Sequence, residues 1–151
     1  MKRKMKKIYI ACTMVALVAL LGVAVWLINR NTATKDVQKA KNRLNIEWYD
    51  ENEKEFTITT ADELYDLAKL STFYDFKGQT IYLGADIVVN EGNAEDWEEK
   101  APSLRWFPID GFAGTFDGQG HSISGLYGYG VDTAMGLFAN TKMNAIIKDF
   151  K

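Results

Sequence analysis

The stretch that decides the fold reads Phe112-Ala-Gly-Thr-Phe-Asp-Gly-Gln-Gly-His-Ser-Ile-Ser-Gly-Leu126. It has no helical period, and its short alternations of polar and apolar residues are interrupted by glycines at positions 114, 118, 120 and 125. Short strands separated by turns at nearly regular intervals are typical of a chain that winds in stacked coils. The pattern therefore predicts a mainly β domain of parallel coils, and it favours a scaffold over a catalytic pocket.

The segments around this stretch predict further strands and one short helix. Alternation of apolar residues predicts strands at 56–59, 79–83, 87–89 and 145–150. Apolar residues at helical spacing predict a helix over 61–71, and Thr60 and Glu63 form a capping box before it. We expect this helix to cover the first coil, whose edge would otherwise pair with other chains. Ile123 and Ile147 lie 24 residues apart, a length that suits one coil.

An uncharged segment near the N-terminus predicts a membrane anchor. Residues 8–28 contain no charged side chain, and as a helix they would be about 32 Å long, close to the roughly 30 Å hydrocarbon core of a bilayer. Five of residues 1–7 are Lys or Arg, so we expect them in the cytoplasm and everything after Asn29 outside the cell. The sequence thus predicts a single-pass cell-membrane protein that contacts lipid through residues 8–28.

A cleaved signal peptide is the alternative for this segment. Its apolar region is usually about 7 to 15 residues long and ends at a small-residue site. Here the run is longer, and the nearest such site, Thr32-Ala33, lies beyond the charged Arg30, which favours an uncleaved anchor. Cys12 is the only cysteine, and Tyr9 occupies the place where a lipoprotein box has an aliphatic residue. Cys12 is therefore expected to be a small apolar residue inside the span.

The chain beyond the anchor is acidic. Residues 31–151 carry 12 Lys and Arg against all 20 Asp and Glu, a net charge of −8. No positive surface would offset phosphate charge, which argues against nucleic acid as a partner. Residues 29–55 are polar and predict a solvated stalk. Residues 56–151 predict the globular part, which has no cysteine and therefore depends on its core instead of disulfides.

Five stretches of the chain, taken together, resemble a known family. They are Phe56-Thr-Ile-Thr-Thr-Ala-Asp-Glu-Leu-Tyr-Asp-Leu-Ala-Lys-Leu70, Phe76-Lys-Gly-Gln-Thr-Ile-Tyr-Leu-Gly-Ala-Asp-Ile87, Trp106-Phe-Pro-Ile109, the 112–126 stretch and Gly136-Leu-Phe138. Their order is similar to the N-terminal start of GLUG-motif bacterial surface proteins, also seen beside the catalytic part of immunoglobulin-A-cleaving metallopeptidases. The resemblance covers residues 56–150. It implies the start of a right-handed parallel β-helix, capped by a short α-helix and not catalytic by itself.

Two features depart from the family pattern. Asp110 stands where these proteins more often have glycine after Trp-x-Pro-Ile. The sequence also stops at Lys151 after few coils, whereas relatives continue for many more. The chain therefore resembles the beginning, or a remnant, of a longer protein.

One histidine and three aspartates are the candidates for catalytic chemistry. His121 could act as a general base beside Asp117, although a strand residue at a turn is the simpler interpretation. Asp110, Asp117 and Asp132 could form the carboxylate cluster of a polysaccharide lyase or glycosidase. Asp110 and Asp117 each precede glycine, as turn aspartates do, and little basic density lies near them. A structural role is therefore favoured for these residues.

Metal and phosphate binding have weaker support. The acidic segment Glu91–Glu99 lacks the alternating ligands and the pivot glycine of a calcium loop, so a solvated loop is favoured. No His-Glu-x-x-His pair exists for zinc. Glycines 118, 120 and 125 are not followed by the lysine and the helix of a phosphate loop. No catalytic, cofactor-binding or metal-binding residue is predicted, and no cofactor.

Aromatic residues are the remaining candidates for a binding surface. Tyr129, and after it Tyr127 and Trp106, could stack on sugar rings, although aromatic residues in a coil more often pack inside. The sequence as a whole predicts a membrane-anchored extracellular module with a structural, adhesive or ligand-presenting role. A glycan or a host-surface protein is the expected partner. The alternative is a fragment of a carbohydrate-active β-helix enzyme, or the non-catalytic leader of a surface peptidase.

Overall fold

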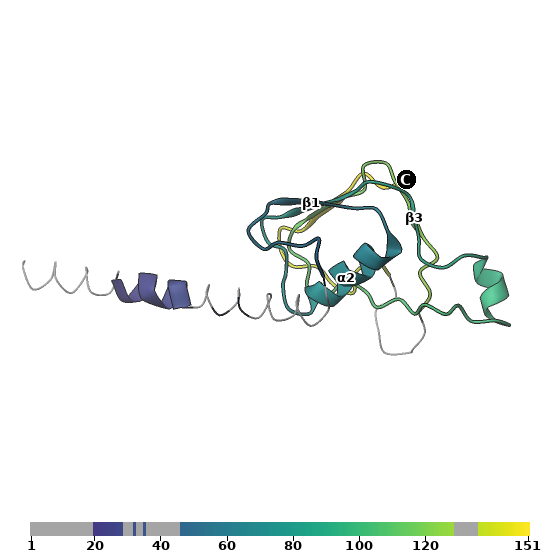
Figure 1. Cartoon of the computed structure of the whole chain (residues 1–151), viewed down its shortest axis with the longest axis horizontal. Coiled ribbons are helices and arrows are strands. Elements are labelled where there is room, and N and C mark those ends of the chain that lie inside the picture. The colour runs from purple at the N-terminus through teal and green to yellow at the C-terminus, as the bar shows by residue number, and fades with distance from the viewer. Residues whose placement is uncertain (1–19, 29–31, 33–34, 36–45, 129–135) are drawn as a thin grey trace, which may run out of the picture. The chain divides into compact units, whose positions relative to one another are not determined.

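The computed structural model of the protein describes residues 20–28, 32, 35, 46–128 and 136–151 (Figure 1). The chain divides into two compact units, Met1–Asp36 and Val37–Lys151. In the first unit, residues 20–28 are helical and exposed. The strands, helix α2 and the core described below belong to the second unit.

The transmembrane helix expected over residues 8–28 is not supported. Among the described residues, no helix is both long and apolar enough to cross a membrane. Residues 1–19, with the expected cytoplasmic segment and Cys12, lie outside the described residues. The finding overturns the prediction of a single-pass membrane protein with a cytoplasmic N-terminus and an extracellular domain.

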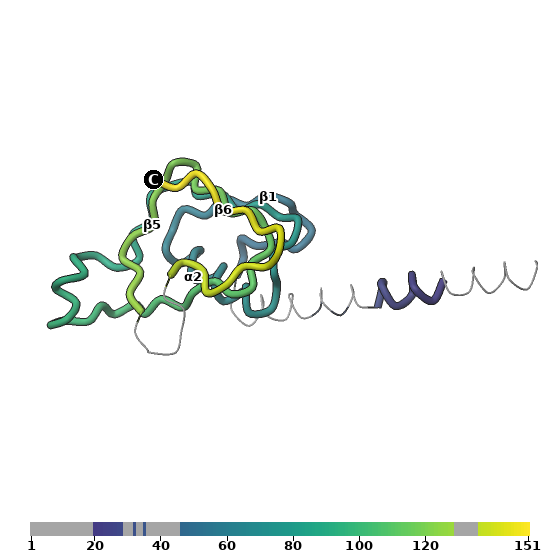
Figure 2. Tube along the Cα trace, turned by 180° about the vertical axis from the view of Figure 1, so that it is seen from behind, coloured from purple at the N-terminus to yellow at the C-terminus, as the bar shows by residue number. Residues whose placement is uncertain are grey.

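The second unit contains short parallel strands and two helical segments within its described part. In chain order they are β1 (Glu55–Ile58), α2 (Ala61–Ser71), β2 (Thr80–Leu83), β3 (Ile87–Val88), the 3₁₀ helix η1 (Ala94–Trp97), β4 (Thr115–Asp117), β5 (Ile123–Ser124) and β6 (Ile146–Lys148). One parallel sheet has the order β1-β2-β4-β6, and β3 pairs with β5 in a second parallel sheet. Successive passes of the chain therefore lie side by side (Figure 2).

This arrangement corrects the predicted fold class. The sequence predicts a mainly β domain that begins a parallel β-helix, whereas the structure is mixed α/β with a small parallel sheet. The strands have two to four residues each, while α2 alone has eleven. The coil expected between Ile123 and Ile147 is also wrong, because Ile123 lies beside Ile87 and Ile147 beside Phe116. Glycines and polar turns end each strand after a few residues, so irregular segments join the strands.

Helix α2 is confirmed with its predicted bounds and cap. The Thr60 hydroxyl accepts a hydrogen bond from the Glu63 N–H at 3.2 Å, and the Glu63 carboxylate accepts one from the Thr60 N–H at 3.0 Å. Burial raises the pKa of Glu63, but the hydrogen bonds from Thr59 and Thr60 outweigh it and leave the pKa below its usual value. The cap satisfies N–H groups that the first helical turn leaves free. The apolar face of the helix is buried through Leu64, Leu67, Ala68 and Leu70.

One column of apolar side chains runs through the four-stranded sheet. The register places in line Phe56, Ile81, Phe116 and Ile147. The first three are at most 7% exposed, whereas Ile147 is 44% exposed. At the β1 end, the rings of Trp48 and Tyr49 lie 5.8 and 4.9 Å from the Phe56 ring. The core is therefore covered by aromatic side chains at its β1 end and exposed at its β6 end.

Candidate ligand-binding groove

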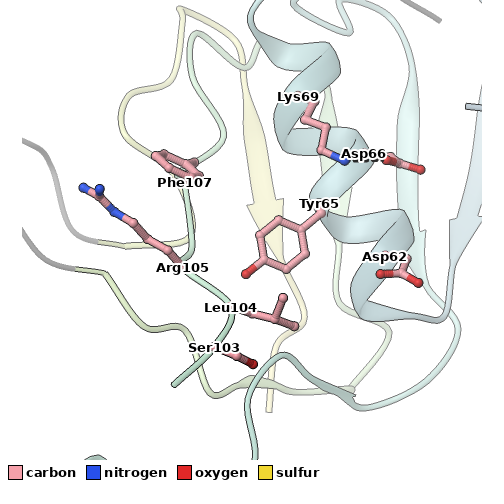
Figure 3. A pocket seen from close by; sticks show the side chains of 8 residues that line it. All are labelled: Asp62, Tyr65, Asp66, Lys69, Ser103, Leu104, Arg105 and Phe107. Atoms are coloured by element: carbon pink, nitrogen blue, oxygen red, sulfur yellow. Dashed lines mark hydrogen bonds and ion pairs between the residues drawn. The ribbon is translucent and has the colours of Figure 1, made fainter. Parts of the chain in front are cut away.

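A surface groove lies between α2 and the segment 103–107 (Figure 3). Its volume is about 420 Å³, within the range of roughly 300–1,000 Å³ that small-molecule sites occupy. The lining residues come from these two elements: Asp62, Tyr65, Asp66, Lys69, Ser103, Leu104, Arg105 and Phe107. The groove thus combines an aromatic surface with charged groups of both signs.

Helix α2 supplies half of the lining because of the spacing of its residues. Positions 62, 65, 66 and 69 recur at intervals of three and four, so they share one side of the helix, apart from the buried leucines. Lys69 Nζ lies 3.2 Å from Asp66 Oδ1, which partly neutralises both charges. The Asp62 side chain is exposed in the first helical turn. Of these groups, the Asp62 carboxylate is the acceptor most available to a ligand.

Trp106 fixes the opposite wall of the groove. Its backbone N–H donates to the Tyr127 carbonyl oxygen at 2.6 Å, and its indole Nε1–H donates to the Gly136 carbonyl oxygen at 2.9 Å. The Trp106 side chain is 4% exposed, and its ring centroid lies 5.3 Å from that of Tyr65. Its neighbours on either side, Arg105 and Phe107, line the groove; Arg105 is half-buried and Phe107 is exposed.

Asn90 holds the start of this wall. Its side-chain amide nitrogen donates to the carbonyl oxygens of Leu104 and Gly125, at 2.8 and 2.9 Å. Its side-chain oxygen accepts from the Leu104 N–H at 3.2 Å. Gly125 has a φ of +73° and packs so closely on the Asn90 backbone that a Cβ would overlap it. Glycine is therefore required for the approach of these two segments.

The outer wall presents an aromatic ring to solvent. Phe107 is 59% exposed, and Leu104 beside it is 46% exposed. The guanidinium carbon of Arg105 lies 5.0 Å from the centroid of the Phe107 ring, a distance at which a cation is attracted to the ring face. An exposed ring with a hydrogen-bond donor beside it is suited to hold a flat ligand with polar edges.

The Tyr65 hydroxyl is a buried polar group of this groove without a partner. It is shielded from solvent and forms no hydrogen bond with any described residue. Burial raises the pKa of Tyr65, so the hydroxyl keeps its proton at neutral pH and remains a donor. Figure 3 shows the hydroxyl directed from α2 toward the segment that carries Leu104 and Arg105. An unsatisfied buried group of this kind costs about 1–3 kcal/mol, which an acceptor on a ligand would recover.

His121 and Asp117, considered together as a general base, take different partners. His121 Nδ1 lies 3.5 Å from Asp86 Oδ1. The Ser122 N–H and hydroxyl donate to the same oxygen at 2.8 and 3.1 Å, and these hydrogen bonds lower the pKa of Asp86. Because the Ser122 hydroxyl donates to Asp86 and not to His121, the three residues do not form a serine–histidine–aspartate relay.

The aspartates considered as a carboxylate cluster also have separate contacts. Asp117 is 3% exposed, and its carboxylate lies 2.7 Å from Lys148 Nζ. Asp110 is exposed and accepts a hydrogen bond from the side-chain amide of Asn140. Asp132 lies outside the described residues. In the described part of the chain, Asp110 and Asp117 therefore have different structural partners.

The candidates for metal and phosphate binding have other surroundings. Within the described ranges, no group of three His, Cys, Asp or Glu side chains could hold a metal ion. The acidic segment 91–99 carries η1 on the surface. Gly118 lies against the backbone of Asp149, where a Cβ would come within 2.6 Å of the carbonyl oxygen. Close packing accounts for this glycine.

The aromatic residues expected to stack on sugars are not the ones at the groove surface. Trp106 is buried, Tyr127 packs edge-on against Trp97 at 5.7 Å, and Tyr129 lies outside the described residues. The sequence reasoning missed Phe107 and Tyr65. Alternation around Trp106 could have found Phe107, because a buried Trp106 requires an outward neighbour. Only the fold brings Tyr65 to the same place.

Comparisons with protein-family models, with curated proteins and with solved structures find no match to this chain.

Proposed function

We propose that residues 46–151 form a non-catalytic binding module that holds a glycan in the groove between α2 and segment 103–107. The observation that carries this proposal is the exposed Phe107 ring, which lines the same groove as the buried, unpartnered Tyr65 hydroxyl. The resemblance of residues 56–150 to the non-catalytic part of GLUG-motif proteins supports a binding role.

The chemistry of the groove matches a sugar. A pyranose ring has an apolar C–H face that packs on an aromatic ring, and hydroxyl groups around its edge that both donate and accept hydrogen bonds. Phe107 and Leu104 offer the apolar surface, Tyr65 offers a donor, and Asp62 offers an acceptor. The lining carries two carboxylates and two cations, so its charges balance. This balance favours a neutral glycan over a strongly charged ligand.

The enzymatic alternative finds less support in the groove. Hydrolysis of a glycoside requires two carboxyl groups on either side of one bond, one of them protonated. Asp66 is held in an ion pair with Lys69, so among the described lining residues Asp62 is the one carboxylate outside that pair. The arrangement favours binding without cleavage.

Glycan binding is tested with the full chain on an array of neutral oligosaccharides, followed by calorimetry on those that bind. We expect Phe107→Ala to weaken binding about tenfold, because the stacking surface is lost. Phe73→Ala is the matched control, since Phe73 is 54% exposed and does not line the groove. The proposal fails if no glycan binds, or if both variants weaken binding equally. Release of reducing ends from a bound glycan would contradict its non-catalytic part.

A further inference from the structure

The Tyr65 hydroxyl determines which chemical group of a ligand can bind beside it. This hydroxyl is shielded from solvent and forms no hydrogen bond with any described residue. A ligand hydroxyl that accepted its hydrogen bond would bring a second hydrogen into the shielded space, and that hydrogen would need an acceptor of its own. A carbonyl oxygen only accepts, so it satisfies Tyr65 and leaves no donor unpaired. The groove therefore favours a carbonyl over a hydroxyl at this point.

Leu104 adds an apolar contact to the same groove. Its side chain is 46% exposed, and it belongs to the segment toward which the Tyr65 hydroxyl is directed (Figure 3). The Leu104 N–H and carbonyl oxygen both bond to the Asn90 side chain, at 3.2 and 2.8 Å, so the backbone that carries Leu104 is held in place. A methyl group packed on Leu104 would remove apolar surface from water. A carbonyl that carries a methyl group, as in an acetyl group, therefore suits both contacts.

The Asp62 carboxylate favours an amide over an ester. Asp62 precedes Tyr65 by three positions on α2, so the two side chains share one side of the helix, and both line the groove. A carboxylate accepts hydrogen bonds and donates none. The N–H and C=O of a trans amide point to opposite sides of its plane, so an acetamido group can donate to Asp62 while it accepts from Tyr65. An acetyl ester has no N–H to offer.

We propose that the groove recognises an N-acetylhexosamine, whose acetamido group is held between Tyr65 and Asp62 and packs on Leu104. The inference rests on the glycan-binding function proposed above and names the class of sugar. The sugar ring lies on Phe107, which is three positions from Leu104. Three residues of chain span at most about 10 Å, so one sugar residue with its acetamido group contacts both side chains. The acetamido group is uncharged, in keeping with the balanced charges of the lining.

Calorimetry on the full chain with two trisaccharides tests this inference. Triacetylchitotriose and cellotriose share the same β-linked glucose frame and differ in one substituent of each ring, an acetamido group or a hydroxyl. We expect triacetylchitotriose to bind at least about tenfold more tightly. Equal affinities, tighter binding of cellotriose, or binding only of other glycans on the array overturns the N-acetyl assignment and leaves the glycan-binding function standing. If no glycan binds at all, the proposed function fails, and this inference fails with it.

Two groove variants locate the acetamido group. Tyr65→Phe removes only the donor, so it should lower the affinity for triacetylchitotriose about tenfold and leave that for cellotriose unchanged. Asp62→Ala removes the acceptor and should lower the affinity for triacetylchitotriose about three- to tenfold. Asp96→Ala is the matched control, because Asp96 is also an exposed aspartate in the first turn of a helical segment but does not line the groove. Unchanged affinity in Tyr65→Phe, or an equal loss for both trisaccharides, contradicts the assignment.

A peptide with the same kind of amide separates sugar recognition from amide recognition. An alanine tripeptide with an acetylated N-terminus carries amide groups and methyl groups but no sugar ring to cover Phe107. We expect it to bind at least about tenfold more weakly than triacetylchitotriose in the same calorimetric titration. Binding of the peptide as tight as that of triacetylchitotriose would assign the groove to a peptide segment and overturn the proposal.

Discussion

Lys148 Nζ lies 2.7 Å from the Asp117 carboxylate, and the register of β4 and β6 places these two residues opposite each other. Asp117 is 3% exposed, so Lys148 provides the charge that compensates its carboxylate. The same ammonium group lies 3.0 Å from Asp149. The ion pair therefore joins the outermost strand of this sheet to its neighbour, in addition to the backbone hydrogen bonds.

Acid should weaken the fold through Asp117. The hydrogen bond from Lys148 lowers the pKa of Asp117 below its usual value. A carboxyl group with a lower pKa in the folded state stabilises the fold at pH above its unfolded pKa of about 3.9, and this contribution is lost as pH falls through the folded pKa. We expect Asp117→Asn to flatten the pH dependence of the melting temperature below about pH 4. Asp149→Asn, at an exposed carboxylate, serves as control, and equal flattening in both variants would contradict this assignment.

Removal of the α2 cap should destabilise the protein moderately. Thr60→Ala deletes the hydroxyl that accepts from the Glu63 N–H, and we expect the free energy of unfolding to fall by about 1 kcal/mol. Thr60→Ser retains the hydroxyl and should unfold close to the wild type. Urea denaturation measures the difference. If the two variants unfold alike, the cap is not a source of stability.

Truncation of the apolar column should be far more severe. Phe116 is fully buried between Ile81 and Ile147, and Phe116→Ala should lower the free energy of unfolding by about 3–5 kcal/mol through lost contacts and a cavity. Phe73→Ala removes an exposed ring and should change it by less than about 0.5 kcal/mol. Chemical denaturation of both variants compares them directly. A similar loss of unfolding free energy in Phe116→Ala and Phe73→Ala would mean that the apolar column is not the core.

Tyr65→Phe should affect stability and binding in opposite directions. The variant removes a buried hydroxyl that has no described partner, so we expect the free energy of unfolding to stay equal or rise by about 1 kcal/mol. Glycan binding should weaken about tenfold, because the donor is lost. Thermal melts and calorimetry on the same preparation measure both effects. A clear loss of stability would show that the hydroxyl already has a partner in the protein.

Two glycines with positive φ separate backbone strain from close packing. Gly125 and Gly120 have φ values of +73° and +76°, but only Gly125 lies against another backbone, that of Asn90. Alanine at either position costs about 1–2 kcal/mol for the left-handed conformation. Gly125→Ala should lose additional stability and also weaken glycan binding, because Asn90 holds Leu104 in the groove wall. Equal losses in urea titrations of both variants would exclude the packing contribution.

The local part of the fold could be predicted from the sequence. Thr60 and Glu63 belong to one helical turn, so their capping box and the helix after it depend only on neighbouring residues. Pairing partners depend on the lengths of irregular connections, which carry no periodic signal. For this reason the spacing of Ile123 and Ile147 predicted a contact that the register does not contain.

The groove was harder to predict than the strands. Tyr65 lies on a helix face that sequence alone assigns to solvent, and the buried Trp106 carries the segment that makes this face a binding wall. The uncharged residues 8–28 illustrate the same limit, since composition predicted a spanning helix that the described residues do not support. Composition identifies apolar residues but not what they contact.

The order β1-β2-β4-β6 follows the order of the sequence, and β5 likewise pairs with the earlier β3. The strands β2, β4, β5 and β6 therefore each pair with a strand that has already been synthesised when they leave the ribosome. The aromatic cover on Phe56 and the capped helix α2 belong to the part made first. We expect folding to begin there during translation and to advance strand by strand toward β6, without waiting for later residues.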